Sequence, residues 1–153
     1  PLLFVAVTAL APLAAGCGPS VHAEVPSGFA IIDSGDEFAF RAANADGVVV
    51  AVRSEDNKPH GDLGFWSQAL AKRLEKRGYA AEGAARAVES KEGTKGMLRT
   101  FKTSSGGRDH VYWLGVYVTD DDVFVVEATG DAESVDAAMR ARIESSIASV
   151  ELG

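Results

Sequence analysis

The 153 residues carry a formal net charge of −7, with 15 Lys and Arg against 22 Asp and Glu. An acidic surface repels phosphate backbones and anionic lipid headgroups, which argues against nucleic-acid binding and against polybasic adhesion to a membrane. The single cysteine excludes an internal disulfide, and the length suits one compact domain of ordinary size rather than two.

The first 16 residues are uncharged and largely apolar, and they lead into Leu13-Ala14-Ala15-Gly16-Cys17. This run is too short to cross a bilayer, which needs roughly 20 apolar residues, but it suits the apolar region of a signal peptide. Small residues directly before a cysteine resemble a bacterial lipobox, where a peptidase cuts before the cysteine and the new amino terminus is acylated. We therefore expect residues 1–16 to be a lipoprotein signal peptide and Cys17 to be the lipidation site. The alternatives are an ordinary secretory signal or a disordered apolar tail, in which Cys17 is incidental.

The remaining chain divides into a short tether and a single domain. Residues 17–25 are expected to form a lipid-anchored tether, and residues 26–153 a single α+β domain. Early in the domain, residues 38–43 alternate in the manner of a half-buried strand. Residues 44–47 read Asn-Ala-Asp-Gly, which favours the positive φ of a tight turn, and they predict a hairpin with a return strand at residues 48–53.

An amphipathic helix is predicted between an N-cap at Asp62 and a C-terminal Gly78. Its apolar side recurs at three- and four-residue spacing, at Leu63, Trp66, Leu70 and Leu74. Its last turns carry the cations Lys72, Arg73, Lys76 and Arg77. Cations at this end complement the helix dipole, but they are also the densest positive spot on an acidic domain and a candidate surface for docking a partner.

Four strands joined by short turns are expected next, at residues 81–90, 95–103, 111–119 and 123–128. Both alternating faces of residues 111–119 are apolar, which predicts a central strand covered on both sides. A closing helix follows, with Asp131 as its N-cap and an apolar side formed by Val135, Met139, Ile143 and Ile147. Short turns between the strands predict an antiparallel meander.

The expected fold class is therefore α+β, an antiparallel β-sheet meander with two helices packed against it. This order of elements resembles the PsbP-like superfamily, whose members include a photosystem II extrinsic subunit, a Ran-binding protein and several bacterial lipoproteins. The resemblance rests on the opening Pro26-Ser27-Gly28-Phe29, the early hairpin, the helix with Trp66, the meander through Trp113 and the last helix. The family is functionally mixed and largely non-enzymatic, so the resemblance implies a fold and a bias towards binding, and no site residues.

Candidate catalytic and metal-binding groups are scattered. The histidines His22, His60 and His110 do not have the i, i+4 spacing that places two imidazoles on one helical face. Asp109 and His110 are adjacent on a strand, so their side chains point to opposite faces. Residues 120–122 are three aspartates, but they lack the alternating donors of a calcium loop. We therefore expect no metal, no cofactor and no enzymatic activity.

Six aromatic residues on the predicted helix and strands are expected either to form the core or to line a groove between helix and sheet: Trp66, Tyr79, Tyr112, Trp113, Tyr117 and Phe124. The function predicted is a non-catalytic, membrane-anchored lipoprotein of the bacterial cell envelope, on the exported side of the outer or cytoplasmic membrane, that binds a protein partner or helps assemble one. The expected contact residues are Trp66, Lys72, Arg73, Lys76, Arg77 and Trp113. The alternative is a small-ligand or lipid carrier with an apolar pocket between sheet and helices.

Overall fold

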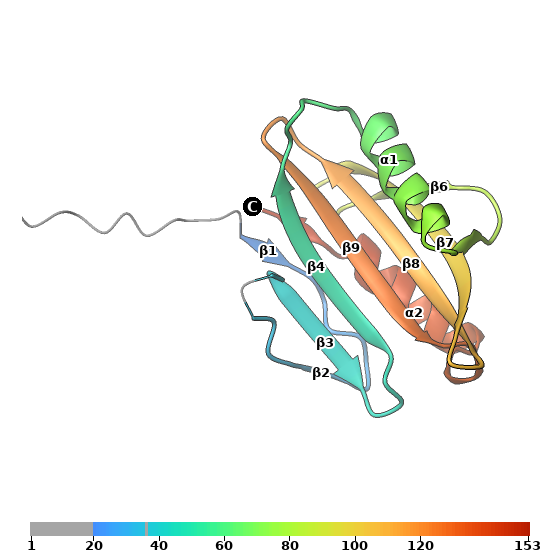
Figure 1. Cartoon of the computed structure of the whole chain (residues 1–153). Coiled ribbons are helices and arrows are strands. Elements are labelled where there is room, and N and C mark those ends of the chain that lie inside the picture. The colour runs from blue at the N-terminus through green and yellow to red at the C-terminus, as the bar shows by residue number, and fades with distance from the viewer. Residues whose placement is uncertain (1–19, 36) are drawn as a thin grey trace, which may run out of the picture.

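The computed structural model describes residues 20–35 and 37–153. In chain order the elements are β1 (Val21–His22), β2 (Phe29–Ile31), β3 (Phe40–Asn44), β4 (Val49–Asp56), α1 (Leu63–Lys76), β5 (Ala80–Ala81), β6 (Arg86–Glu89), β7 (Lys95–Ser105), β8 (Arg108–Val118), β9 (Asp122–Asp131), the 3-10 helix η1 (Ala132–Ser134), α2 (Ala137–Ala148) and β10 (Glu151–Leu152). Figure 1 shows α1 on one face of a large sheet and α2 on the other.

The large sheet has eight strands, in the order β2-β3-β4-β9-β8-β7-β5, and β6 also pairs with β7. Each of its pairings is antiparallel. A separate two-stranded sheet joins β1 to β10. The predicted α+β class, with two helices packed against an antiparallel sheet, is therefore confirmed.

The early hairpin and the first helix form for the reasons that the sequence suggests. Asn44 Oδ1 accepts hydrogen bonds from the N–H groups of Asp46 and Val48, and Gly47 has a φ of 79°, which closes the turn between β3 and β4. Asp62 caps α1, because its carboxylate accepts a 2.8 Å hydrogen bond from the Phe65 N–H. Gly78, with a φ of 92°, ends the helix.

Two predicted elements differ from the structure. Residues 81–90 form two short strands, β5 and β6, instead of one, because Gly83 with its φ of 77° breaks the extended run. Asp131 precedes η1 without a side-chain cap, and the N-cap of α2 is Asp136, which accepts a 2.7 Å hydrogen bond from the Met139 N–H. The closing helix therefore begins five residues later than Asp131 would place it.

The expected tether is folded in part. Val21 and His22 of β1 pair with Leu152 and Glu151 of β10, and Val21 is only 6% exposed. Residues 20–25 therefore belong to the folded part of the chain, and the domain begins before residue 26. Cys17 and the predicted signal peptide, residues 1–16, lie outside the described residues.

Each face of the sheet has its own apolar core. The side chains of β8 alternate between them, so that Trp113 and Tyr117 face α2 while Leu114 and Val116 face α1. This confirms that residues 111–119 include a strand covered on both sides. Neither α1 nor α2, the α-helices of the described residues, is long and apolar enough to cross a membrane.

Candidate functional site

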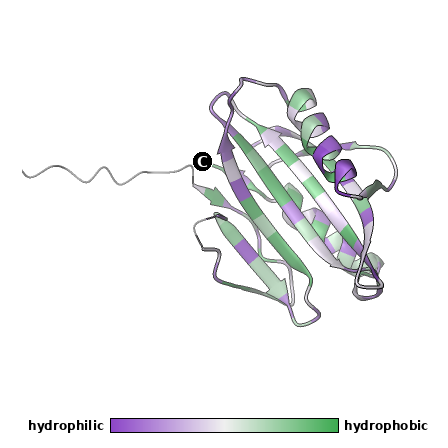
Figure 2. Cartoon of the chain, in the orientation of Figure 1, coloured by the Kyte–Doolittle hydropathy of each residue, from purple (hydrophilic) through white to green (hydrophobic). Residues whose placement is uncertain are grey.

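The predicted contact residues do not form one surface. Trp113 is fully buried between the sheet and α2, so it offers nothing to a partner. Trp66 belongs to α1, on the opposite face of the sheet; it is half-buried, and its indole N–H donates a 2.7 Å hydrogen bond to Asn57 Oδ1. The remaining four residues are exposed cations on the last turns of α1: Lys72, Arg73, Lys76 and Arg77. Figure 2 shows that hydrophilic residues gather on this half of the helix.

The aromatic residues also separate into two groups. Trp66, Tyr79 and Tyr112 pack on the α1 side of the sheet. Trp113, Tyr117 and Phe124 pack on the α2 side and are fully buried there. The six aromatic side chains therefore line no common groove between helix and sheet, because consecutive residues of β8 point to opposite faces.

A polar groove lies beside α1, with a volume of about 520 Å³. Its lining comes from α1, β4, β9 and the segment before β3, and comprises Glu37, Phe38, Arg53, Ser54, Glu55, Arg73, Arg77 and Glu127. We call this the charged groove. Arg73 and Arg77 reach it together because residues four apart lie on one side of a helix. Lys72 and Lys76 belong to the same basic helix end but do not line the groove.

The floor of the charged groove is a network of side chains from three neighbouring strands. Arg53 of β4 contacts Glu55 on the same strand, and its Nε lies 3.5 Å from Glu127 Oε2 on β9. The Tyr112 hydroxyl of β8 donates a 2.5 Å hydrogen bond to Glu127 Oε1. Burial, and then the nearby Glu127 carboxylate, raise the pKa of Tyr112 above its usual value, so it stays a neutral donor. Arg53 is thus balanced by two carboxylates.

The two arginines of the rim differ from Arg53. Within residues 20–35 and 37–153, neither Arg73 nor Arg77 forms an ion pair or a side-chain hydrogen bond. A guanidinium group presents donors in a fork that matches a carboxylate. Among the described residues, the groove therefore offers two guanidinium groups without an ion-pair partner above a polar floor, an arrangement suited to binding an anionic group.

A second polar cluster lies at the end of the β7–β8 hairpin and contains the candidate pair Asp109 and His110. His110 Nδ1 is 2.9 Å from Asp131 Oδ1, and Arg108 Nη1 is 2.9 Å from Asp131 Oδ2. Ser104 Oγ contacts Asp109 instead. Because Asp109 and His110 are consecutive in β8, the serine contact and the histidine contact lie on opposite faces of the strand and make no single site.

The side chains that could coordinate a metal ion are also far apart. In the part of the chain that the structure describes, no three His, Cys, Asp or Glu side chains gather closely enough to hold a metal ion.

Sequence reasoning found the rim of the charged groove but missed its floor. Arg53 and Glu127 are charged residues within otherwise apolar strands, which was the available signal. Glu37, Phe38 and Glu55 carry no comparable signal. Arg53 and Glu127 come together because β4 pairs with β9, with Arg53 opposite Val125 and Ala51 opposite Glu127, and this register does not follow from local sequence patterns.

Comparison with solved structures finds the same fold elsewhere. LpqN, described as involved in cell envelope biogenesis of Mycobacterium tuberculosis, matches with a TM-score of 0.66 and 15% identity, over 88% of this chain and 84% of LpqN. The chain shares the fold of LpqN. A protein of Bacteroides thetaiotaomicron matches with a TM-score of 0.53 and 14% identity, and this chain spans only 45% of that longer protein.

The sequence itself has no detectable relatives in two further comparisons. No family model matches, and none of the curated proteins matches. At 14–15% identity the structural likeness establishes the fold alone. The resemblance to the PsbP-like superfamily stays a prediction.

Proposed function

We propose that this chain is a non-catalytic protein of the bacterial cell envelope, anchored by lipid at Cys17, that binds a protein partner through the charged groove. The lipobox-like sequence before Cys17 supports the anchor. The fold shared with LpqN, a protein involved in cell envelope biogenesis, supports the location.

The observation that carries the binding role is the pair of guanidinium groups of Arg73 and Arg77 at the rim of the charged groove. The chain as a whole has a net charge of −7, so this basic helix end contrasts with the rest of the surface. A partner segment that carries carboxylates would pair with both arginines, and Lys72 and Lys76 would extend the attraction along the helix. The aromatic ring of Phe38 gives the same groove an apolar contact.

The floor of the groove supports a binding role rather than a chemical one. Glu127 accepts a hydrogen bond from the Tyr112 hydroxyl and forms an ion pair with Arg53. The polar groups of the floor are therefore bound to one another. Such a network fixes the shape of the groove and keeps its side chains in place when a partner docks.

Charge reversal within α1 tests the proposal with a matched control. In the full-length protein in its native membrane, a photo-crosslinking amino acid at Phe38 should give a defined crosslinked product with the partner. The double variant Arg73→Glu, Arg77→Glu should lower the yield of that product several-fold. The double variant Lys72→Glu, Lys76→Glu has the same change in net charge on the same helix and should keep most of it.

Equal yields from both double variants would contradict the proposal that the groove is the binding site. Thermal unfolding of each variant checks that α1 still folds. These four positions are exposed, but the substitutions reverse favourable charges at the C-terminal end of the helix dipole, so we expect a similar loss of about 1–2 kcal/mol in both double variants.

A further inference from the structure

The first described residues, from Ser20 onward, are bound to the C-terminal end of the domain. The N–H of Gly153 donates a 2.8 Å hydrogen bond to the carbonyl of Ser20. Val21 and His22 then pair with β10, and the Val21 side chain enters the core beside Val150 and Leu152. The domain thus holds this segment by backbone pairing and by a buried apolar side chain.

The next residues are tied to the last turns of α2. The Glu24 carbonyl accepts a 2.7 Å hydrogen bond from Ser146 Oγ, and the Glu24 N–H donates a 2.9 Å hydrogen bond to Ser149 Oγ. Lys91 Nζ lies 2.6 Å from Glu151 Oε1 and 3.8 Å from Glu24 Oε1, which joins the segment to the loop before β7. The segment has little freedom to swing away from the domain.

This attachment shortens the link between the lipid anchor and the fold. Ser20 lies three residues after Cys17, a stretch that spans at most about 11 Å when fully extended. A free tether to residue 25 would instead span roughly 30 Å. A domain of this size has a radius of gyration of about 14 Å. The maximum length of the link is therefore less than the radius of gyration of the domain.

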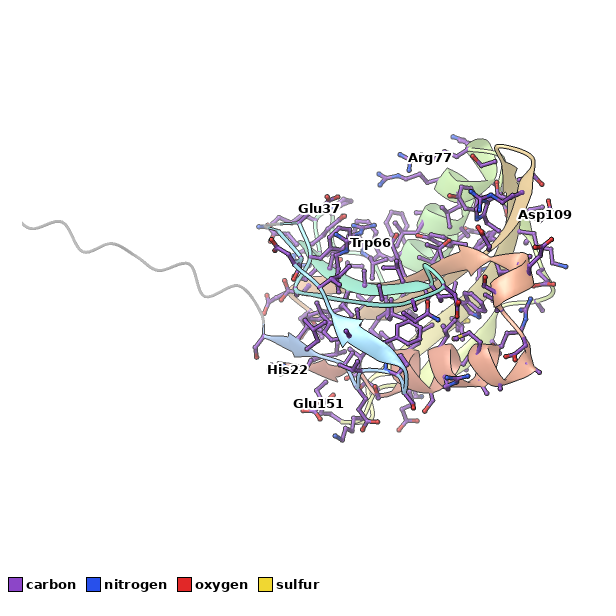
Figure 3. The ribbon with its side chains drawn as sticks, turned by 90° about the horizontal axis from the view of Figure 1, so that it is seen from below. His22, Glu37, Trp66, Arg77, Asp109 and Glu151 are labelled. Carbon is purple, nitrogen blue, oxygen red and sulfur yellow. The ribbon has the colours of Figure 1, made fainter. Side chains whose placement is uncertain are left out.

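We infer that the end of the domain formed by β1 and β10 lies against the lipid surface and that the domain is held there in one orientation. This inference rests on the proposed lipid anchor at Cys17. Figure 3 shows His22 and Glu151 together at one side of the molecule, with Arg77 and Asp109 on the sides away from them. Arg77, at the rim of the charged groove, then lies away from the lipid surface.

The surface around β1 and β10 carries more carboxylates than cations: Glu24, Glu92 and Glu151 against Lys91. Electrostatic attraction to anionic lipids therefore does not produce the orientation. The short link produces it, so a zwitterionic lipid surface is sufficient.

Energy transfer from the domain to the membrane tests the orientation. The acylated protein is purified and placed in phosphatidylcholine vesicles that contain an acceptor-labelled lipid. Acylation occupies the thiol of Cys17, the single cysteine, so an introduced cysteine is the one free thiol. A donor dye at Glu24→Cys should transfer several-fold more efficiently than the same dye at Asp109→Cys. Both positions are exposed, and equal transfer from the two would overturn the inference.

A lengthened link is the matched control. An insertion of about 20 Gly and Ser residues between Gly18 and Pro19 leaves β1 in place but adds a flexible reach of roughly 25 Å, and it should bring the two transfer efficiencies close together. If the insertion leaves a large difference unchanged, the short link is not the cause of the orientation. Purified protein without acyl mass at Cys17 would contradict the anchor itself, a result that differs from acylated protein with equal transfer.

Discussion

Asn57, directly after β4, links three segments of the chain through its side-chain amide. Its Oδ1 accepts hydrogen bonds from Trp66 Nε1 at 2.7 Å and from the Gly61 N–H at 2.9 Å. Its Nδ2 donates to the carbonyls of Thr119, at 2.9 Å, and Gly61, at 3.2 Å. The residue is 4% exposed, so water cannot replace these bonds. The start of α1, and with it the position of the helix on the sheet, depends on this one side chain.

Asn57→Ala should lower the free energy of unfolding by about 2–4 kcal/mol, because it leaves several part-buried donors and acceptors without partners. Urea denaturation should show a lower midpoint with an unchanged slope. Trp66→Phe, which removes the indole N–H, should cost much less in the Asn57→Ala background than in the parent. A loss below about 0.5 kcal/mol for Asn57→Ala would contradict this account.

At the same scale, the sequence identified the cations of the charged groove but misjudged Trp113. Arg73 and Arg77 are near the end of a strongly patterned helix, so their exposure follows from the pattern. Trp113 lies in a strand that is apolar on both faces, and the pattern does not say which partner covers which face. The packing of α2 decides that Trp113 is buried.

Between elements, β8 and α2 approach unusually closely. A Cβ atom on Gly115 would lie 2.8 Å from Ile147 Cγ2, so the helix can rest on the strand only where a side chain is missing. Two residues along β8, the buried Tyr117 hydroxyl donates a 2.8 Å hydrogen bond to the Ile147 carbonyl. This bond satisfies a carbonyl in the last turn of α2 and fixes the helix on the sheet.

Tyr117 should also make the protein sensitive to high pH. Burial raises the pKa of Tyr117 to about 12, whereas tyrosine in the unfolded chain ionises near pH 10. Below pH 10 both states keep the proton, and the stability contribution is complete. Between about pH 10 and 12 only the unfolded state loses the proton, so the free energy of unfolding should fall by about 2–3 kcal/mol.

In Tyr117→Phe, the decline between pH 10 and 12 should be smaller, although Tyr112, whose pKa is also raised by burial, keeps part of it. At pH 7 the variant should be less stable by about 1 kcal/mol, because the Ile147 carbonyl loses its donor. Urea denaturation at a series of pH values measures both effects. Parallel pH profiles for parent and variant would show that Tyr117 does not keep its proton in the fold.

At the scale of the whole molecule, the β1–β10 sheet and the charged groove lie at separate places. The β1–β10 sheet joins the two ends of the described chain, whereas the charged groove lies between α1 and the centre of the large sheet. Figure 1 shows β1 and the C-terminus beside each other, away from α1. Under the proposed function, a partner in the groove would not displace the β1–β10 end of the domain.

If the proposed lipid anchor holds the protein at the membrane, Cys17→Ser should release it from the membrane fraction, because the acyl chains supply the attachment. Mass spectrometry of the parent should show acyl chains at Cys17, and the variant should have none. If the parent carries no acyl chains and the variant binds the membrane as strongly as the parent, the lipid anchor is wrong. The substitution should leave the folded domain unchanged. Thermal unfolding curves of parent and variant in detergent should therefore coincide.

The sequence by itself determined the fold class, the first hairpin and α1, because each depends on local signals: an Asn and Asp-Gly turn, an N-cap and a periodic apolar face. It also predicted Arg73 and Arg77 as contact residues for a partner, which stays a prediction. The tertiary structure decided that β1 is bound to β10, that β4 joins β9, and that Trp66 and Trp113 face opposite cores. These features depend on contacts between residues far apart in the chain, which local periodicity does not encode.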